Sequence, residues 1–98
     1  MKIKRTLEGS ALTLALEGRL HTTTAPELEQ AIKADLDNAD ALVIDFAGLD
    51  YISSAGLRVP LSAHKAMARK GGMKVVHANE MVMEVFEVTG FSDILSVE

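Results

Sequence analysis

Hydrophobic and polar residues alternate near the start of the chain. Between residues 11 and 16, leucine occupies every second position and small residues lie between the leucines. A period of two is typical of a strand with one buried face, so this segment predicts a β-strand. A weaker alternation over residues 3–7 predicts another strand, and Glu8-Gly-Ser10 is expected to form the hairpin turn between the two.

Apolar residues then recur at helical spacing, which predicts a helix that ends at about Leu36. Thr24-Ala-Pro-Glu27 precedes this stripe and matches a capping box. In that motif the Thr24 hydroxyl accepts from an amide of the first turn, and Glu27 reaches back to the cap amide. Pro26 is tolerated in the first turn because its missing N–H has no intrahelical partner there. The stripe consists of Leu28, Ala31, Ile32 and Leu36.

The middle of the chain predicts a strand, a helix and another strand. Leu42–Phe46 is nearly continuous in apolar character, as expected for a central strand that is covered on both faces. A helix is predicted from about Ala55 to Lys70, with Gly71 in the left-handed position that ends many helices. The next strand is predicted over Met73–His77.

A third helix is predicted after Asn79, a good N-cap residue, and before Gly90, a good C-terminal residue. Met81 or Met83 is expected to lie away from its apolar stripe and to form part of an adaptable partner surface. A short final strand is predicted over Ile94–Val97. The apolar stripe of the helix consists of Val82, Val85 and Phe86.

These elements follow the order β-β-α-β-α-β-α-β within one predicted domain, residues 1–98. Strands that alternate with helices imply right-handed crossovers and a largely parallel sheet. The N-terminal hairpin makes that sheet mixed. The predicted fold class is therefore α/β, with the helices packed on the sheet.

Composition argues against several classes of function. The net charge is −4, and no basic cluster extends beyond Arg69-Lys70, whereas nucleic-acid binding depends on neutralising phosphates. The chain has no cysteine, so disulfides, thiol nucleophiles and zinc–thiolate sites are excluded. There is neither a signal-peptide pattern nor an apolar run as long as a membrane span. We expect a cytoplasmic protein with no membrane span and no cofactor or metal.

Asp50–Leu57 is the segment with the most informative chemistry. It is expected to be a small-residue loop that joins the buried strand to the second helix. A helix N-terminus favours negative charge because of its free N–H groups and the macrodipole. Ser54 is therefore well placed to carry or contact a phosphate. The alternative is that Ser53 or Ser54 only caps the helix.

Four segments support a more specific interpretation. They are Gly18-Arg-Leu-His-Thr-Thr-Thr-Ala-Pro-Glu27, Val43-Ile-Asp-Phe46, Tyr51-Ile-Ser-Ser-Ala-Gly-Leu-Arg58 and Val88-Thr-Gly-Phe91. Together with the order of the elements, they resemble the STAS domain, and specifically the small bacterial anti-sigma factor antagonists. The resemblance covers nearly the whole chain and is most specific around Ser54.

The resemblance implies a phosphorylation switch. In that family an anti-sigma factor, which is an ATP-dependent serine kinase, binds the unphosphorylated antagonist and thereby frees a sigma factor. The kinase phosphorylates one serine of this loop, the complex dissociates, and a phosphatase resets it. Counting back from Gly56 and Leu57 places the acceptor at Ser54, and no catalytic activity is expected in this chain. The residues expected to contact the partner are His21, Thr22, Thr23, Ser53, Ala55, Gly56 and Arg58.

Three features depart from the family pattern. His21 replaces a residue that is usually acidic, in a loop expected beside the serine. Pro60 lies inside the second helix, where we expect a kinked or irregular first turn and a half. We do not expect, within residues 1–98, the further helix that usually follows the last strand in the family, so part of one sheet face is expected to be uncovered. A partner, or a second copy in a weak homodimer, could cover that face.

Two other functions fit parts of the sequence. One is a STAS scaffold subunit of a signalling or lipid-transport complex that is not phosphorylated. The other is a Ser-His hydrolase built on Ser54 and His21, although the chain has no Gly-x-Ser-x-Gly elbow. Asp45 and Asp50 could indicate metal or acid–base chemistry, but we expect them to accept hydrogen bonds from backbone N–H groups and in turns.

Overall fold

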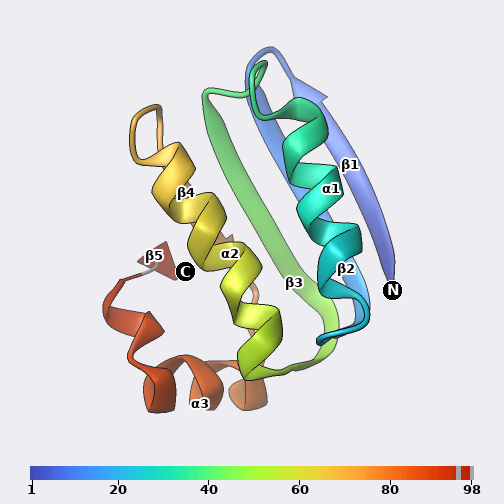
Figure 1. The fold of residues 1–98 in the computed structure, drawn as a ribbon, viewed down its shortest axis with the longest axis vertical. Coiled ribbons are helices and arrows are strands. Elements are labelled where there is room, and N and C mark those ends of the chain that lie inside the picture. The colour runs from blue at the N-terminus through green and yellow to red at the C-terminus, as the bar shows by residue number, and fades with distance from the viewer. Residues whose placement is uncertain (95, 98) are drawn as a thin grey trace.

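The protein is described by a computed structural model that covers residues 1–94 and 96–97 (Figure 1). The order of strands and α-helices is the predicted one, and a short 3-10 helix is added before the last strand. The elements are β1 (Lys2–Glu8), β2 (Ala11–Leu20), α1 (Ala25–Asp35), β3 (Ala41–Ile52), α2 (Ser54–Met67), β4 (Met73–Val76), α3 (Glu80–Thr89), η1 (Phe91–Asp93) and β5 (Ser96–Val97).

The strands form one mixed sheet in the order β1-β2-β3-β4-β5. β1 is antiparallel to β2, and every later strand is parallel to its neighbour. When parallel neighbours follow one another in sequence, right-handed crossovers bring their helices to the same face. Figure 1 shows α1 and α2 in front of the sheet and α3 across its lower end. The predicted α/β fold with a mixed sheet is confirmed.

The core lies between the sheet and the helices. Leu42, Ile44 and Phe46 of β3 are almost completely buried on the side that faces the helices. Val43 and Asp45 point to the other face of the sheet and are only half-buried. The expectation that β3 is covered on both faces is therefore wrong, because the sequential strand order brings α1 and α2 to one side.

β3 extends well beyond the predicted strand. Residues 50–52, which were expected in part to begin the serine loop, form its last part. The pairing with β2 shifts register twice, and Gly48 lies at the first shift. A Cβ on Gly48 would lie 2.9 Å from the carbonyl oxygen of Leu16. These bulges interrupt the period of two, which explains why the alternation ends near Phe46 although the strand does not.

The first turn of α1 is not the predicted capping box. Thr24 has helical backbone angles and makes no side-chain cap hydrogen bond. Its Oγ1 instead donates to the carbonyl of Arg19 (2.7 Å) and accepts from the amide of His21 (3.0 Å). The Glu27 carboxylate lies 3.9 Å from the amino group of Met1. The end of β2 thus provides Thr24 with partners that local sequence does not reveal.

α2 is continuous through Pro60 and ends earlier than predicted, at Met67. The predicted irregular first turn and a half is not observed. The left-handed residue after the helix is Gly72 (φ 88°) rather than Gly71. Gly71 instead packs against the loop before β3, where an added Cβ would lie 2.5 Å from the carbonyl oxygen of Asp40.

The two ends of α3 agree with the prediction. The Asn79 side chain accepts a hydrogen bond from a first-turn amide (2.8 Å), and Gly90 ends the helix with φ 79°. The strand predicted over Ile94–Val97 corresponds to the shorter β5, and Leu95 lies outside the described residues. No helix in the described part of the chain is long and apolar enough to cross a membrane.

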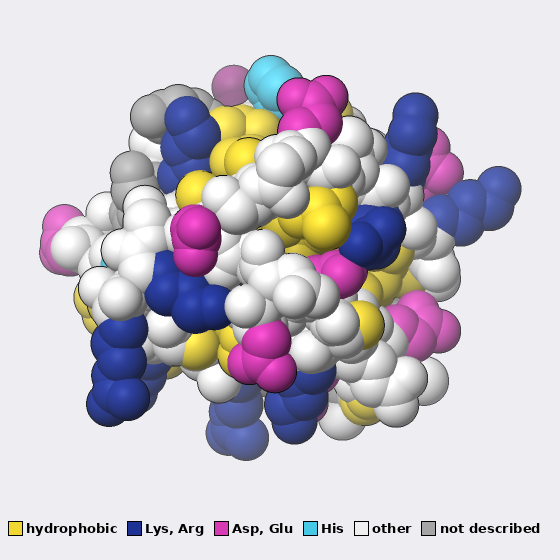
Figure 2. Space-filling view, turned by 90° about the horizontal axis from the view of Figure 1, so that it is seen from above, with side chains coloured by type: hydrophobic (Ala, Val, Ile, Leu, Met, Phe, Trp, Pro, Cys, Tyr) yellow, Lys and Arg dark blue, Asp and Glu magenta, His cyan; other side chains and the backbone are white. Residues whose placement is uncertain are grey.

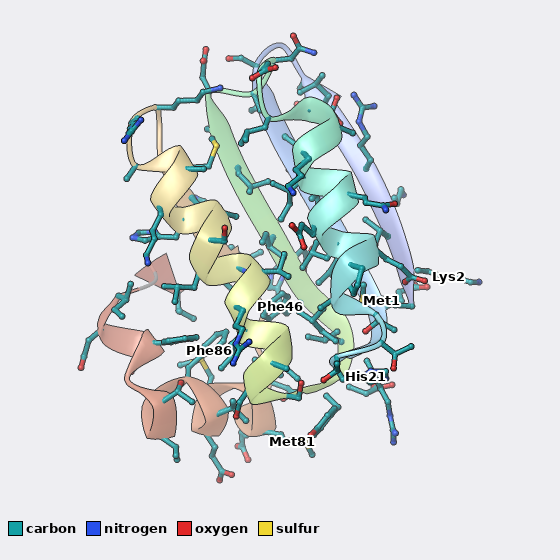
Figure 3. The ribbon with its side chains drawn as sticks, in the orientation of Figure 1. Met1, Lys2, His21, Phe46, Met81 and Phe86 are labelled. Carbon is teal, nitrogen blue, oxygen red and sulfur yellow. The ribbon has the colours of Figure 1, made fainter. Side chains whose placement is uncertain are left out.

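Two aromatic rings hold α3 against the sheet (Figure 3). Phe46 of β3 and Phe86 of α3 are fully buried, and their ring centroids lie 6.1 Å apart. We predict that Phe46→Ala lowers the free energy of unfolding by about 3–5 kcal/mol, because it leaves a cavity beneath α3. Urea denaturation measures this change.

The control for this prediction is Val88→Ala, since Val88 also belongs to α3 but is 87% exposed. Its free energy of unfolding should change by less than about 0.5 kcal/mol. Equal losses in Phe46→Ala and Val88→Ala would contradict the role that we assign to the buried ring pair.

An ion pair joins the outer strand to the first helix. Both Nε and Nη2 of Arg5 in β1 donate to the carboxylate of Asp35 at the end of α1, and the Nη2 distance is 2.8 Å. Asp35 is nearly buried, whereas the Arg5 side chain is half-exposed. The hydrogen bonds from Arg5 lower the pKa of Asp35 below its ordinary value, although burial opposes them in part.

We predict that Asp35→Asn makes the protein's stability less sensitive to acid. A carboxyl group with a lowered folded pKa stabilises the protein above its unfolded pKa, and this contribution disappears as the pH falls through the folded pKa. The melting temperature of the wild type should therefore fall more steeply below about pH 4 than that of Asp35→Asn. Glu29→Gln, which breaks an exposed pair with Lys33, is the control. Identical acid slopes for the wild type and Asp35→Asn would refute the prediction.

Candidate functional site

The candidate site lies where β2 and β3 end side by side. Leu20 is the register partner of Ile52, and the Ser53 amide donates to the carbonyl of Leu20 (2.9 Å). The loop after β2 and the start of α2 are therefore neighbours, as the sequence predicts for His21 and the serine segment. Figure 3 shows His21 at the lower end of β2, close to the start of α1.

The two serines of the loop have different roles. Ser53 has an extended backbone, and its Oγ accepts a hydrogen bond from the Gly56 amide (3.0 Å), so it is the N-cap of α2. Its carbonyl accepts from the amide of Leu57 (3.1 Å). Ser54 is the first residue of the helix and is exposed. The capping role thus belongs to Ser53, which leaves the Ser54 hydroxyl accessible at the positive end of the helix dipole.

Gly56 brings the start of α2 close to the sheet. It is buried, and an added Cβ would lie 2.5 Å from the carbonyl oxygen of Leu20. Only glycine allows such an approach without a backbone shift. Ala55 beside it is half-buried, so the surface of this loop is formed mainly by Ser54.

The loop that follows β2, beside the serine segment, is a tight turn that begins at His21. The His21 carbonyl accepts from the amides of Thr24 (3.1 Å) and Ala25 (2.7 Å). Thr22 and Thr23 are exposed at the tip of this turn. The amide of Thr23 donates to His21 Nδ1 (3.2 Å), which places the proton of the neutral imidazole on Nε2.

This surface also includes Arg19 and Tyr51, which the sequence did not single out, and Met81, which it did. Arg19 and Tyr51 are cross-strand partners, and the guanidinium lies 5.9 Å from the ring centroid. Met81 is 51% exposed in the first turn of α3 (Figure 3), which the Asn79 side chain ties to the carbonyl of Leu49 at 3.0 Å. The Arg19–Tyr51 pair could be found only from the register of β2 and β3.

Of the two methionines expected at a partner surface, only Met81 is well exposed, because Met83 packs against the core. Figure 2 views the opposite end of the molecule, where basic and acidic side chains are interspersed.

The expected structural role of Asp45 is confirmed. Its Oδ1 accepts from the Ala47 amide and from His77 Nδ1, both at 2.9 Å. Burial alone would raise the pKa of Asp45, but these two hydrogen bonds lower it on balance. His77 was predicted to end β4 but instead follows the strand with φ 60°. Within residues 1–94 and 96–97, no group of three or more His, Cys, Asp or Glu side chains could hold a metal ion.

Comparisons with known proteins agree with this geometry. A family model described as "Mlab, STAS domain" matches residues 3–96. BtrV of Bordetella bronchiseptica, a proposed anti-sigma factor antagonist, is 35% identical over 99% of this chain and 85% of its own length. The crystal structure of an anti-sigma factor antagonist from Mycobacterium paratuberculosis has a TM-score of 0.88 at 25% identity, covering 98% of this chain and 83% of that one.

The fold is also shared with the Bacillus cell fate determinant SpoIIAA in two states. Its unphosphorylated form has a TM-score of 0.83 at 14% identity, covering 99% of this chain and 88% of that chain. Its phosphorylated form has a TM-score of 0.76 at 13% identity, covering 99% and 91%. At these identities the likeness concerns the fold alone.

The close contact at Gly56 leads to a prediction about the loop. Gly56→Ala should lower the free energy of unfolding by about 1–3 kcal/mol, because the new methyl group meets the backbone of Leu20. Ser54→Ala, at an exposed position two residues earlier, should change it by less than about 0.5 kcal/mol. Thermal and urea denaturation of the two variants test this, and equal stability of Gly56→Ala and wild type would contradict it.

Proposed function

Because this chain belongs to the STAS domain family, we propose that it is an anti-sigma factor antagonist switched by phosphorylation of Ser54. In its unphosphorylated state it binds an anti-sigma factor that is a serine kinase, and a sigma factor is released. The kinase supplies the nucleotide and transfers its terminal phosphoryl group to the Ser54 hydroxyl. A phosphatase restores the binding state.

The observation that carries this proposal is the division of roles between the two serines. Ser53 Oγ is occupied by the Gly56 amide, whereas Ser54 is exposed on the first turn of α2. A kinase can therefore reach the Ser54 hydroxyl without unfolding the cap. The relatives that bear the name anti-sigma factor antagonist support the same assignment.

The switch can be local. A phosphoserine carries about −1.5 to −2 charges at neutral pH, and the N-terminus of a helix tolerates that charge. A partner docked over the loop would have to remove water from the phosphate, which costs several kcal/mol when the charge is unpaired. SpoIIAA has been solved with this fold in phosphorylated and unphosphorylated forms, which supports a switch without a change of fold.

The partner surface in this proposal surrounds Ser54. It includes the exposed tip of the neighbouring turn, Thr22 and Thr23, together with His21. We add Tyr51 and Met81, because they are among the exposed large hydrophobic side chains and lie at the same end of the sheet. The predicted contacts Ser53, Ala55 and Gly56 shape the loop, and Arg58 lies one turn further along α2.

A Ser-His hydrolase fits this site less well. The Nδ1 atom of His21 accepts from the Thr23 amide, so Nε2 of the neutral ring carries a proton and cannot take one from Ser54. We therefore propose a binding protein that has no catalytic activity of its own.

Affinity capture from the source cells tests the proposal, with wild type, Ser54→Ala, Ser54→Asp and Ser62→Asp as baits. Ser62 is exposed two turns further along α2, so it controls for an added charge on the same helix. We expect wild type, Ser54→Ala and Ser62→Asp to retain an ATP-binding kinase. Ser54→Asp should retain at least about tenfold less, since its charge is buried by the partner.

The recovered kinase should then add one phosphoryl group to wild type and none to Ser54→Ala, as measured by mass spectrometry. An identical set of partners with all baits would overturn the proposal and would instead support a scaffold subunit that is not phosphorylated.

A further inference from the structure

The solvent-facing side of α2 carries a regular row of polar side chains. Ser54, Arg58, Ser62 and Lys65 are all exposed, whereas the residues on the opposite side of the helix are buried. Residues four apart in an α-helix are neighbours on its surface. Arg58 is therefore the basic side chain next to Ser54 along this row.

The direction of helical side chains favours contact between these two residues. Cα–Cβ bonds in a helix tilt toward its N-terminus, so a long side chain covers the turn that precedes it. For Arg58 that turn begins at Ser54. An arginine at this position can donate two N–H groups to a phosphate in a planar, bidentate arrangement.

Arg58 is also available for a new partner. Among the described residues, the guanidinium makes no ion pair or hydrogen bond, and the first turn of α2 contains no acidic residue. Arg58 lies at the edge of a groove between α1 and α2, where the nearby acid, Glu29, is already paired with Lys33 at 2.8 Å. Among the described residues that line this groove, Glu29 is the only acid, and Lys33 already pairs with it.

We propose that Arg58 is the intramolecular ligand of the phosphate on Ser54, so that phosphorylation withdraws an exposed cation from the partner surface. The inference rests on the proposed function, since it assigns a second residue to the same switch. In the unphosphorylated protein Arg58 is free to contact an acidic group of the anti-sigma factor. In the phosphorylated protein the phosphate holds Arg58, while the N-terminus of α2 favours the charge of the phosphate.

In this arrangement phosphorylation weakens partner binding in two ways. The partner meets a new negative charge at Ser54 and also loses a positive one at Arg58, which the phosphate has neutralised. Because the pair lies within one helix, its formation needs only rotation of one flexible side chain. Release of the partner therefore does not require a change in the backbone.

Phosphoserine incorporated at position 54 by an expanded genetic code tests this without any kinase. The second ionisation of the phosphate is followed by phosphorus NMR in the wild type, Arg58→Met and Lys65→Met. Lys65→Met is the matched control because it removes the same charge from the same face of α2, about 10 Å further along the helix axis than Arg58.

A paired arginine favours the dianion, so the titration midpoint of Arg58→Met should lie about 0.3 pH unit or more above that of wild type. The phosphate of Lys65→Met should have the same titration midpoint as that of the wild type. The midpoint of Arg58→Lys should lie between those of the wild type and Arg58→Met. Equal midpoints for Arg58→Met and Lys65→Met would overturn the inference.

The outcome is separate from that of the proposed function. If the kinase modifies Ser54 but the Arg58→Met midpoint does not move, the switch remains and Arg58 has no part in holding the phosphate. If the midpoint moves but the capture experiment fails, the phosphate site exists without the proposed partner. Circular dichroism of each variant verifies that α2 is intact before the titrations are compared.

Discussion

The parallel pairing of β2 with β3 is the constraint on which the rest of the molecule depends. It is the longest parallel pairing in the sheet, and it brings Leu20 beside Ile52 at the end from which both following helices start. Because the two strands are neighbours in sequence and in space, right-handed crossovers bring α1 and α2 to one face. The same pairing sets the turn at His21 against the start of α2. The contact between these two loops therefore follows from strand register, whereas the serine segment itself is a local motif.

Most of the architecture can be predicted from sequence because its signals are local. The alternating leucines of β2, the Asn79 cap and Gly90 each specify an element through its nearest neighbours. The departures come from contacts between residues far apart in the chain. Gly48 forms a bulge against β2, and Gly71 packs on the loop before β3, so neither follows from a local pattern. Thr24 does not cap α1 as predicted for a related reason. Its hydroxyl instead donates to the carbonyl of Arg19, near the end of β2.

The candidate site also has one part that sequence predicts and another that only the structure shows. Spacing locates a small-residue loop at a helix start and selects two serines, but it does not decide which serine is the cap. That decision needs the backbone conformation of Ser53, whose extended angles place its Oγ over the Gly56 amide. The stacking of Arg19 on Tyr51 depends on two bulges in the pairing of their strands, which no sequence period encodes. Helical spacing alone, by contrast, relates Arg58 to Ser54.

The first strand has a consequence for how the protein behaves at high concentration. β1 is an edge of the sheet, and one side of its backbone is open to strand addition. Lys2, Lys4 and Arg5 fall within this short strand. In a parallel, in-register pairing, two such edges would bring these like charges together, which opposes stacking into fibrils at this edge. This edge is therefore not expected to seed aggregates when the protein is concentrated.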